Sequence, residues 1–185
     1  MLKNFRFVMV LLIICGMAYP ILMTGMAQLM MPAKAEGSLI KNDSGELIGS
    51  EMIGQTFKDP GYFHGRVSSI EYNAAGSGTP NFASSNEEFI NRTKKDISKF
   101  LKENPTIDKA EIPSDLMTNS GSGLDPNITP NGAKVQVPRI ALKRGLSEKT
   151  VYLLVEKQTS NRSLGIFGEP RINVLELNMA LDELK

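Results

Sequence analysis

The chain offers few residue patterns that could carry out chemistry. Residues 61–66 read Gly-Tyr-Phe-His-Gly-Arg, in which three residues separate two glycines and an arginine follows. A Walker A phosphate loop has four residues between its glycines and then Lys-Ser/Thr, so a structured turn with its aromatic side chains in the core fits better. The chain has one His and one Cys, which excludes a disulfide framework and a Cys/His zinc site and disfavours a Ser-His or Cys-His nucleophile.

Other candidate motifs also lack a required residue. Gly121-Ser122-Gly123 differs from a nucleophile elbow because Ser120 stands where the first glycine is needed. Residues 108–111 read Asp-Lys-Ala-Glu and share only two residues with the D-K-T-G phosphorylation signature. Turn geometry explains the scattered acids near Gly or Pro better than acid/base catalysis does; these are Asp43, Asp59, Asp125 and Glu169. The sequence therefore predicts no catalytic residue and no metal ligand.

Length and charge narrow the class of protein further. The chain has 185 residues, enough for one ordinary domain plus an appendage. Lys and Arg number 21 against 20 Asp and Glu, a formal net charge of +1. A nucleic-acid-binding protein would normally show a basic excess on one face, so we expect no nucleic-acid partner.

The appendage is at the N-terminus. Residues 7–31 contain no charged side chain, and as a helix they would span roughly 37 Å, enough to cross a hydrocarbon core of about 30 Å. A cleaved signal peptide is the alternative, because Ala33-Lys34-Ala35 resembles a cleavage site, but the apolar run is longer than a usual signal core. Lys3 and Arg6 precede the run, so the positive-inside rule predicts a cytoplasmic N-terminus at 1–6, a transmembrane helix at 7–31 in membrane lipid, and an extracytoplasmic soluble domain at 32–185.

The sequence of the soluble part predicts a mixed α/β domain of the α+β class after the transmembrane helix. Apolar pairs on either side of residues 42–45 indicate a short hairpin, and loops follow to residue 80. Ser85 with Glu88 resembles a capping box that starts a helix ending before Pro105.

Further helices follow toward the C-terminus. Thr129-Pro130 predicts the start of a helix that Pro138 kinks and Gly145 ends. Ser147 and Asn173 predict the caps of two more helices. A breaker cluster at residues 165–170 separates these two.

Several separated stretches together resemble one family over nearly the full chain. They are residues 37–40, 48–51, 54–55, 59–60, 62–66, 120–126, 137–139, 144–147, 164–165 and 168–178. In this order they are similar to the C subunit of the Kdp potassium-transporting ATPase. Two departures stand out: Val67 occupies a position where the family usually has Pro, and the family's glycine-rich stretch is reduced at residues 76–86.

The resemblance implies a non-catalytic subunit of the high-affinity, ATP-driven potassium uptake complex. In that family a channel-like A subunit selects potassium, a P-type B subunit hydrolyses ATP, and a small F subunit stabilises the assembly. The C subunit is described as a catalytic chaperone that raises the ATP affinity of the B subunit. ATP and K+ would then act at the level of the complex, no cofactor is expected on this chain alone, and any nucleotide-binding residues are unknown.

Two other classes of function remain open at this stage. One is a membrane-anchored extracytoplasmic binding or scaffold protein unrelated to transport. The other is a secreted enzyme released by cleavage near Ala35.

If the domain is outside the cell, where ATP is scarce, it could change ATP affinity only through a conformational equilibrium of the complex. Our hypothesis is that it packs over the extracellular face of the A subunit and braces the A–B assembly or shapes the ion entry vestibule.

The candidate partner-contact residues come from the motifs that carry the resemblance. The first group is Tyr62, Phe63, His64 and Arg66, which could instead form a corner of the core with a satisfied His. The second group is Ser122, Leu124 and Asp125, which could instead form an obligatory turn. The third group is Glu169 and Arg171, which could instead form a salt-bridged turn.

Overall fold

The computed structural model describes residues 1–42 and 44–184. The chain divides into two compact units, Met1–Ser50 and Glu51–Lys185. Each unit is described by itself below. The predicted class, a mixed helix and strand domain after an apolar helix, is confirmed.

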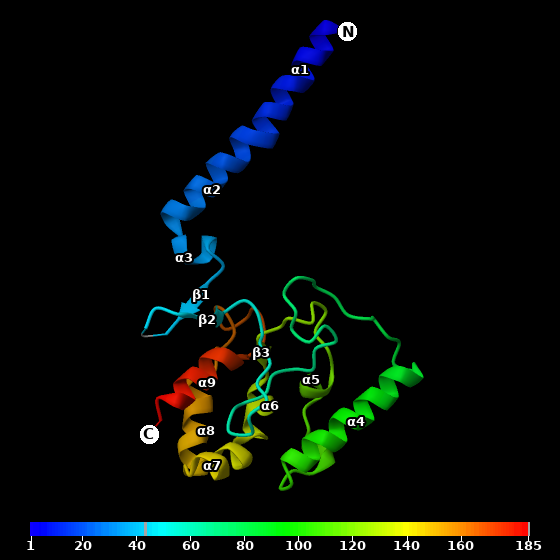
Figure 1. Ribbon diagram of the computed structural model, residues 1–185, viewed down its shortest axis with the longest axis vertical. Helices are drawn as coiled ribbons and strands as arrows, with labels where there is room; N and C mark the ends of the chain where they lie inside the picture. The colour runs from blue at the N-terminus through cyan, green and yellow to red at the C-terminus, as the bar shows by residue number, and fades with distance from the viewer. Residues whose placement is uncertain (43, 185) are drawn as a thin grey trace. The chain divides into compact units, whose positions relative to one another are not determined.

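The first unit begins with one continuous helix, drawn in blue in Figure 1. It consists of α1 (Leu2–Ile13), a π-helical turn (Ile14–Ala18) and α2 (Tyr19–Met30). Pro20 has no N–H to donate to the preceding turn, and a π turn just before it widens the helix at that point. No side chain of this helix is buried. An 18-residue window within it has a mean hydropathy of 2.3, so the helix is long and apolar enough to cross a membrane.

A hairpin closes the first unit. After the short α3 (Pro32–Ala35), β1 (Leu39–Lys41) pairs antiparallel with β2 (Leu47–Ser50), with Leu39 opposite Ser50. The Ser50 hydroxyl donates a hydrogen bond to the Gly37 carbonyl at 2.7 Å. The predicted hairpin is confirmed, although Asp43 of its predicted turn lies outside the described residues.

The second unit is built from helices around one apolar core. Figure 1 shows α7, α8 and α9 close together, with the long α4 on the other side of the intervening loops. Ile140, Val151, Val155, Leu177 and Leu181 are fully buried in this core. Its elements are α4 (Glu87–Glu103), a 3-10 turn (Lys109–Glu111), α5 (Ser114–Met117), β3 (Asn127–Ile128), α6 (Pro130–Lys134), α7 (Val137–Arg144), α8 (Glu148–Lys157), β4 (Ile172–Asn173) and α9 (Val174–Asp182). Strands β3 and β4 pair antiparallel.

Most predicted helix caps are confirmed. The side chains of Thr129, Ser147 and Asn173 accept hydrogen bonds from backbone N–H groups in the first turns of α6, α8 and α9. The predicted Ser85 cap of α4 is wrong by one residue, because the Asn86 side chain accepts from the Phe89 N–H at 3.0 Å. Asn and Ser are about equally good caps, so neighbouring candidates cannot be separated by propensity.

The predicted kink at Pro138 is also wrong. The chain forms two helices instead of one bent helix: α6 ends at Lys134, and α7 begins at Val137 with Pro138 in its first turn. The first turn of a helix has N–H groups without helical partners, so a proline costs no hydrogen bond there. Gly145 ends α7 as predicted, with a φ of 67°.

Candidate functional site

The motif segment of residues 59–66 lies against the core of the second unit. Residues 63–66 belong to no helix or strand, so their buried backbone groups need other partners. The Asn178 side chain accepts from the Phe63 N–H at 2.8 Å and donates to its carbonyl at 3.0 Å. Gln136 bonds the backbone of His64 in the same way, at 2.8 Å and 3.0 Å. Two buried side-chain amides thus form the hydrogen bonds that a neighbouring strand would otherwise make with this segment.

Arg139 of α7 holds the start of the same segment. Its guanidinium donates to the Tyr62 carbonyl at 3.0 Å, to the Gln136 side chain at 2.8 Å, and to the Pro60 carbonyl. A further bond runs to the Asn104 side chain at 3.0 Å. Burial lowers the pKa of Arg139 to about 10, and the charges of Glu103 and Asp59 partly oppose that shift. The residue therefore remains a cation at neutral pH and joins α4, α7 and the segment.

Tyr62 and Phe63 lie differently, although they are neighbours in the sequence. The Phe63 side chain is fully buried in the core. The Tyr62 ring is partly exposed, and the Arg144 guanidinium lies over it at 4.5 Å. The carboxylate of Asp182 accepts from the Tyr62 hydroxyl at 3.0 Å and pairs with Arg144 at 2.7 Å. Phe63 therefore belongs to a corner of the core, whereas Tyr62 lies partly at the surface.

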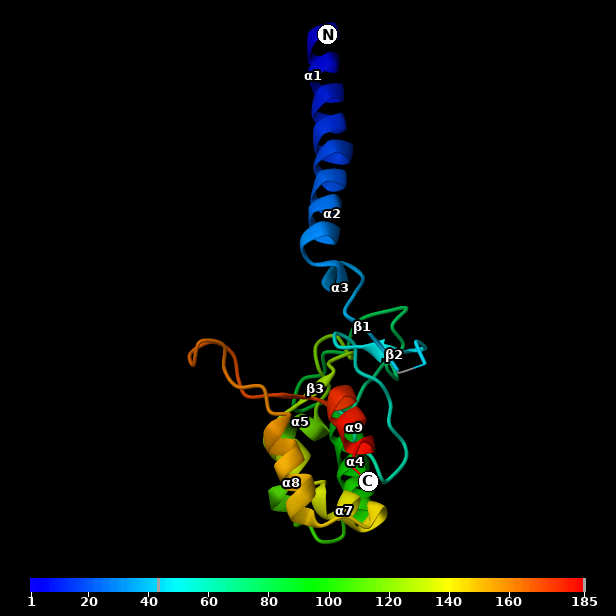
Figure 2. The ribbon, with the colours of Figure 1, turned by 90° about the vertical axis from the view of Figure 1, so that its left-hand side faces the viewer.

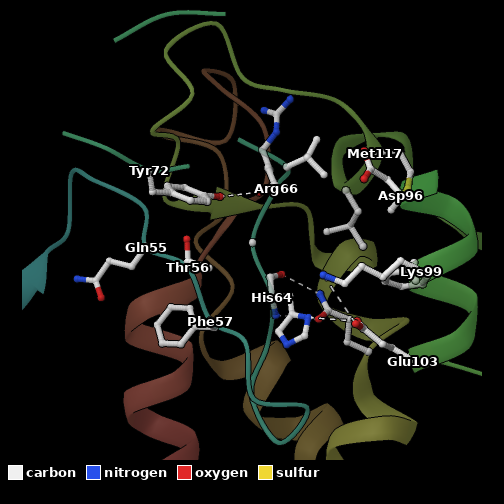
Figure 3. Close-up of a pocket in the computed structure, with 15 residues that line it drawn as sticks. Gln55, Thr56, Phe57, His64, Arg66, Tyr72, Asp96, Lys99, Glu103 and Met117 are labelled. Carbon is white, nitrogen blue, oxygen red and sulfur yellow. Dashed lines mark hydrogen bonds and ion pairs between the residues drawn. The ribbon is translucent and has the colours of Figure 1, made fainter. Parts of the chain in front are cut away.

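His64 faces a cavity of about 170 Å³ (Figure 3). Its Nε2 lies 3.0 Å from the Asp59 carbonyl oxygen, which can only accept, so this nitrogen carries the proton of the neutral ring. Its Nδ1 lies 3.7 Å from the Glu103 carboxylate. Burial, followed by the charge of Arg139, lowers the pKa of His64 below its usual 6.5. The His64 imidazole is therefore mostly neutral at pH 7.

The lining of the cavity is partly apolar and partly charged. Phe57, Phe100, Leu116 and Met117 contribute apolar side chains, and Lys99 and Glu103, which also line it, pair at 3.9 Å. Its volume suits a small polar molecule or several waters. Among residues 1–42 and 44–184, no three His, Cys, Asp or Glu side chains group so as to hold a metal ion.

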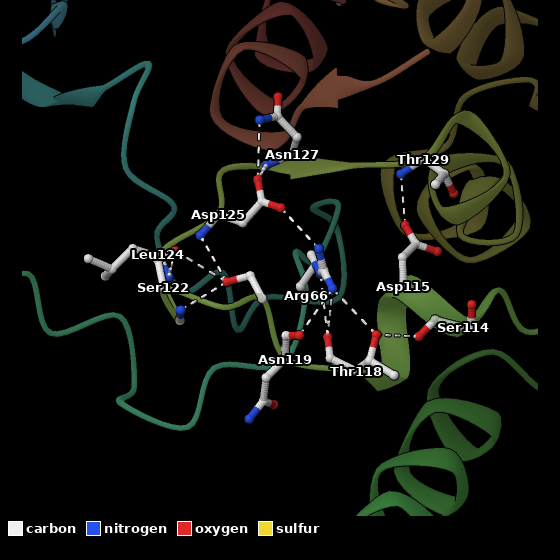
Figure 4. Close-up of polar contacts among 12 residues, drawn as sticks. Arg66, Ser114, Asp115, Thr118, Asn119, Ser122, Leu124, Asp125, Asn127 and Thr129 are labelled. Carbon is white, nitrogen blue, oxygen red and sulfur yellow. Dashed lines mark hydrogen bonds and ion pairs between the residues drawn. The ribbon is translucent and has the colours of Figure 1, made fainter. Parts of the chain in front are cut away.

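Arg66 connects the motif segment to the loop of residues 118–127 (Figure 4). Its guanidinium pairs with the Asp125 carboxylate at 3.0 Å and donates to the carbonyls of Thr118 and Asn119 at 3.3 and 3.2 Å. The other oxygen of Asp125 accepts from the Asn127 N–H at 3.0 Å. Arg66 and Asp125 therefore hold the loop in place and leave part of each side chain exposed.

Within this loop of residues 118–127, polar groups bond both to one another and to two distant segments. The Ser122 hydroxyl accepts from the Leu124 N–H at 3.1 Å, and the Ser122 carbonyl accepts from the Gly78 N–H at 2.8 Å. The Leu124 carbonyl accepts from the Gly54 N–H at 2.8 Å. Gly123 has a φ of 71°, which favours glycine. The loop therefore holds in place the segments at Gly54 and Gly78, which are distant from it in the sequence.

Glu169 and Arg171 belong to the segment between α8 and α9. Glu169 pairs with Arg162 at 2.7 Å on the surface, and the backbone of Arg171 bonds that of Ser160. Both residues also line an open hollow of about 250 Å³ that Arg66 and Asp125 share. The structure thus brings four of the predicted residues to one hollow, while His64 faces a different cavity.

Sequence reasoning missed the residues that hold the motif segment, namely Gln136, Arg139, Asn178 and Tyr72. The Tyr72 hydroxyl donates to the Arg66 carbonyl at 2.6 Å, and burial, with the charge of Asp125, raises its pKa to about 12. One signal in the sequence pointed to Asn178: it is a polar residue at a position that helical periodicity assigns to the core. For Tyr72 the sequence holds no such signal.

Comparisons with known proteins show which family the chain belongs to. The family model described as "K+-transporting ATPase, c chain" matches residues 1–183. A Bacillus cereus protein (strain ATCC 10987 / NRS 248) named potassium-transporting ATPase KdpC subunit is 51% identical over 179 residues, covering 97% of this chain and 93% of its own length. A Bacillus anthracis protein of the same name is 50% identical over the same coverage. Because the match extends from the apolar helix to the last helix, the chain belongs to the KdpC family, the c chain of K+-transporting ATPases.

Proposed function

We propose that this chain is the singly anchored accessory subunit of an ATP-driven potassium uptake complex, and that it acts by binding other subunits. The observation that carries this proposal is the exposed apolar helix Leu2–Met30, which the family match includes. An apolar surface of that length is unfavourable in water, so lipid and the helices of partner subunits must cover it. The apolar run at residues 7–31 is also longer than a usual signal core, so we propose that the anchor stays attached to the mature protein.

The charges beside the anchor support one orientation. Lys3 and Arg6 lie at its N-terminal end, whereas Lys34 is soon followed by Glu36 at the other end. Basic residues favour the cytoplasmic side. We therefore place the N-terminus in the cytoplasm and the second unit outside the cell.

This orientation determines how the chain affects ATP use. The chaperone effect on the P-type B subunit is then indirect, through a conformational equilibrium of the complex that binding of this chain shifts. The second unit braces the channel-like A subunit from outside, and the small F subunit stabilises the assembly in the membrane. The hollow shared by Arg66, Asp125, Glu169 and Arg171 supports this role, because it offers a partner both signs of charge.

Potassium-stimulated ATP hydrolysis by the purified complex tests the proposal. The complex is prepared with and without this chain, and its rate is measured over a range of ATP concentrations. We expect the chain-free complex to lose most of its potassium-stimulated activity and to have a higher KM for ATP. An unchanged rate and KM would overturn the accessory role.

Cysteine labelling tests the orientation separately. Cys15 is the only cysteine in the chain, so Cys15→Ser provides a background without thiols. In that background, an exposed thiol from Lys102→Cys should react with a membrane-impermeant maleimide in intact cells. Asn4→Cys, the control at the opposite end of the anchor, keeps both Lys3 and Arg6 and should react only after permeabilisation. The reverse pattern would contradict the proposed topology.

A further inference from the structure

The segment between α8 and α9 presents three large apolar side chains to solvent. Leu164, Ile166 and Phe167 are 88%, 72% and 65% exposed. Figure 2 shows this segment, in orange, extending away from α8 and α9. The apolar core of the second unit is assembled from other residues, so folding of this chain does not explain the three side chains.

The segment is an ordered hairpin whose tip is apolar and whose stem is polar. Ser160 and Arg171 exchange two backbone hydrogen bonds at 2.9 and 3.0 Å, and Ser163 and Phe167 are bridged at 2.8 and 2.9 Å. Arg162 pairs with Glu169 across the stem at 2.7 Å. We call residues 160–171 the apolar-tipped hairpin.

The tip is held in a backbone shape that costs energy. Leu164 has a φ of 54°, a left-handed conformation that is uncommon for a leucine, and the neighbouring Gly165 has a φ of 73°. This conformation turns the chain at the tip while Leu164 stays largely exposed. Because the shape exists before any partner binds, little ordering entropy is lost on docking.

We propose that the apolar-tipped hairpin docks into an apolar socket on another protein subunit of the transport complex, outside the membrane. This inference rests on the proposed function. An apolar centre with a polar rim is the usual composition of a protein interface, and here the tip supplies the centre and the Arg162–Glu169 pair supplies the rim. Curated relatives are named as subunits of a potassium-transporting ATPase, so the chain has protein partners to provide the socket.

Charge argues against lipid as the occupant. Arg162 and Glu169 neutralise one another, which leaves Arg171 as the unpaired charge among residues 160–171. Lipid-binding segments usually carry several basic residues that are attracted to anionic headgroups. Three side chains bury less area than a stable interface of about 800 Å² per partner needs, so the hairpin is one contact of a chain that its transmembrane helix also tethers to the complex.

Site-specific photocrosslinking of the full chain within its complex tests the socket. Photoreactive benzoylphenylalanine replaces Phe167 in one variant and Leu142 in the control, because Leu142 is an exposed leucine (83%) on α7 of the same unit. We expect the probe at 167 to crosslink to a larger subunit of the complex and the probe at 142 to give no such product. Crosslinks to lipid alone, or none at 167, would overturn the proposal.

Affinity purification gives a second, quantitative readout. The double variant Ile166→Ser, Phe167→Ser should retain at least about tenfold less of the other subunits after a detergent wash than the wild type does, whereas Leu142→Ser should retain them fully. Equal retention by the double variant would overturn the docking role of the tip while the accessory function stands. If the wild-type chain itself retrieves no subunits of the ATPase, the proposed function fails and the docking inference fails with it.

Discussion

The side chain of Gln136 forms two hydrogen bonds with the backbone of His64, 72 residues earlier in the chain. Its Nε2 also donates to the Gly132 carbonyl at 2.9 Å, and its Oε1 accepts from Arg139 at 2.8 Å. Asn178 of α9 forms the equivalent pair with Phe63. The motif segment therefore depends on polar side chains that are themselves buried, and each bond in this network can be tested.

Replacing Asn178 by leucine should strongly destabilise the protein. Asn178→Leu keeps a similar volume but leaves the buried N–H and carbonyl of Phe63 without partners. We expect a loss of about 2–4 kcal/mol in the free energy of unfolding, measured by urea denaturation of the full chain in detergent. Asn91→Leu, at an exposed position of α4, is the matched control and should change stability by less than about 0.5 kcal/mol. Equal effects would show that the amide pair is unimportant.

Removing the Arg139 cation should cost more than removing a surface cation on the same helix. Arg139→Met deletes the donor of four polar contacts in the core, and we expect a loss of about 3–5 kcal/mol. Lys143→Met changes an exposed residue of α7 and should be nearly neutral. Thermal unfolding followed by circular dichroism distinguishes them, and similar melting temperatures for the two variants would contradict the assigned role of Arg139.

The protein should lose stability as the pH falls through the range in which His64 titrates. Burial and Arg139 hold the pKa of His64 below 6.5 in the folded state. Between that lowered pKa and 6.5 the unfolded chain binds more protons, so the unfolding free energy decreases as the pH falls from 7 and levels off below the folded pKa. His64→Gln should remove this part of the pH dependence.

The His64 titration can be observed directly. His64 is the only histidine in the chain, so one imidazole resonance in an NMR pH titration reports its pKa without assignment. Glu103 raises this pKa, and Glu103→Gln should therefore lower it further. A wild-type value at or above 6.5 would contradict the burial and charge that the structure assigns to His64.

Alanine should destabilise the protein at one glycine of the loop of residues 118–127 and be tolerated at another. A Cβ at Gly123 would lie 2.9 Å from both the Gly78 carbonyl oxygen and the Ile70 side chain, and its φ of 71° disfavours alanine. Gly123→Ala should therefore cost about 2 kcal/mol or more. A Cβ at Gly121 meets no atom within 4 Å, so Gly121→Ala should leave the melting temperature of the chain unchanged. Tolerance of alanine at position 123 would show that this turn is not obligatory.

Local features were predictable because their causes lie within a few residues. Thr129, Ser147 and Asn173 cap helices through bonds to N–H groups two or three residues away, and such patterns are visible in a sequence. Ser85 and Asn86 show the limit of this reasoning, since two adjacent good caps compete and the path of the chain decides between them. Pro138 was ambiguous for a similar reason, because proline fits either a kink or a first turn.

The sequence by itself determined the apolar helix, the first hairpin, three of the helix caps and the family, because hydropathy, capping residues and motif order are written along the chain. The tertiary structure alone decided that Gln136 and Asn178 bind a segment 72 and 115 residues away. It also decided that Arg66 meets Asp125 and that Phe167 stays at the surface while Phe63 is buried. The reason is physical: burial and pairing depend on which distant segments come into contact when the core closes, and no short stretch of sequence contains that information.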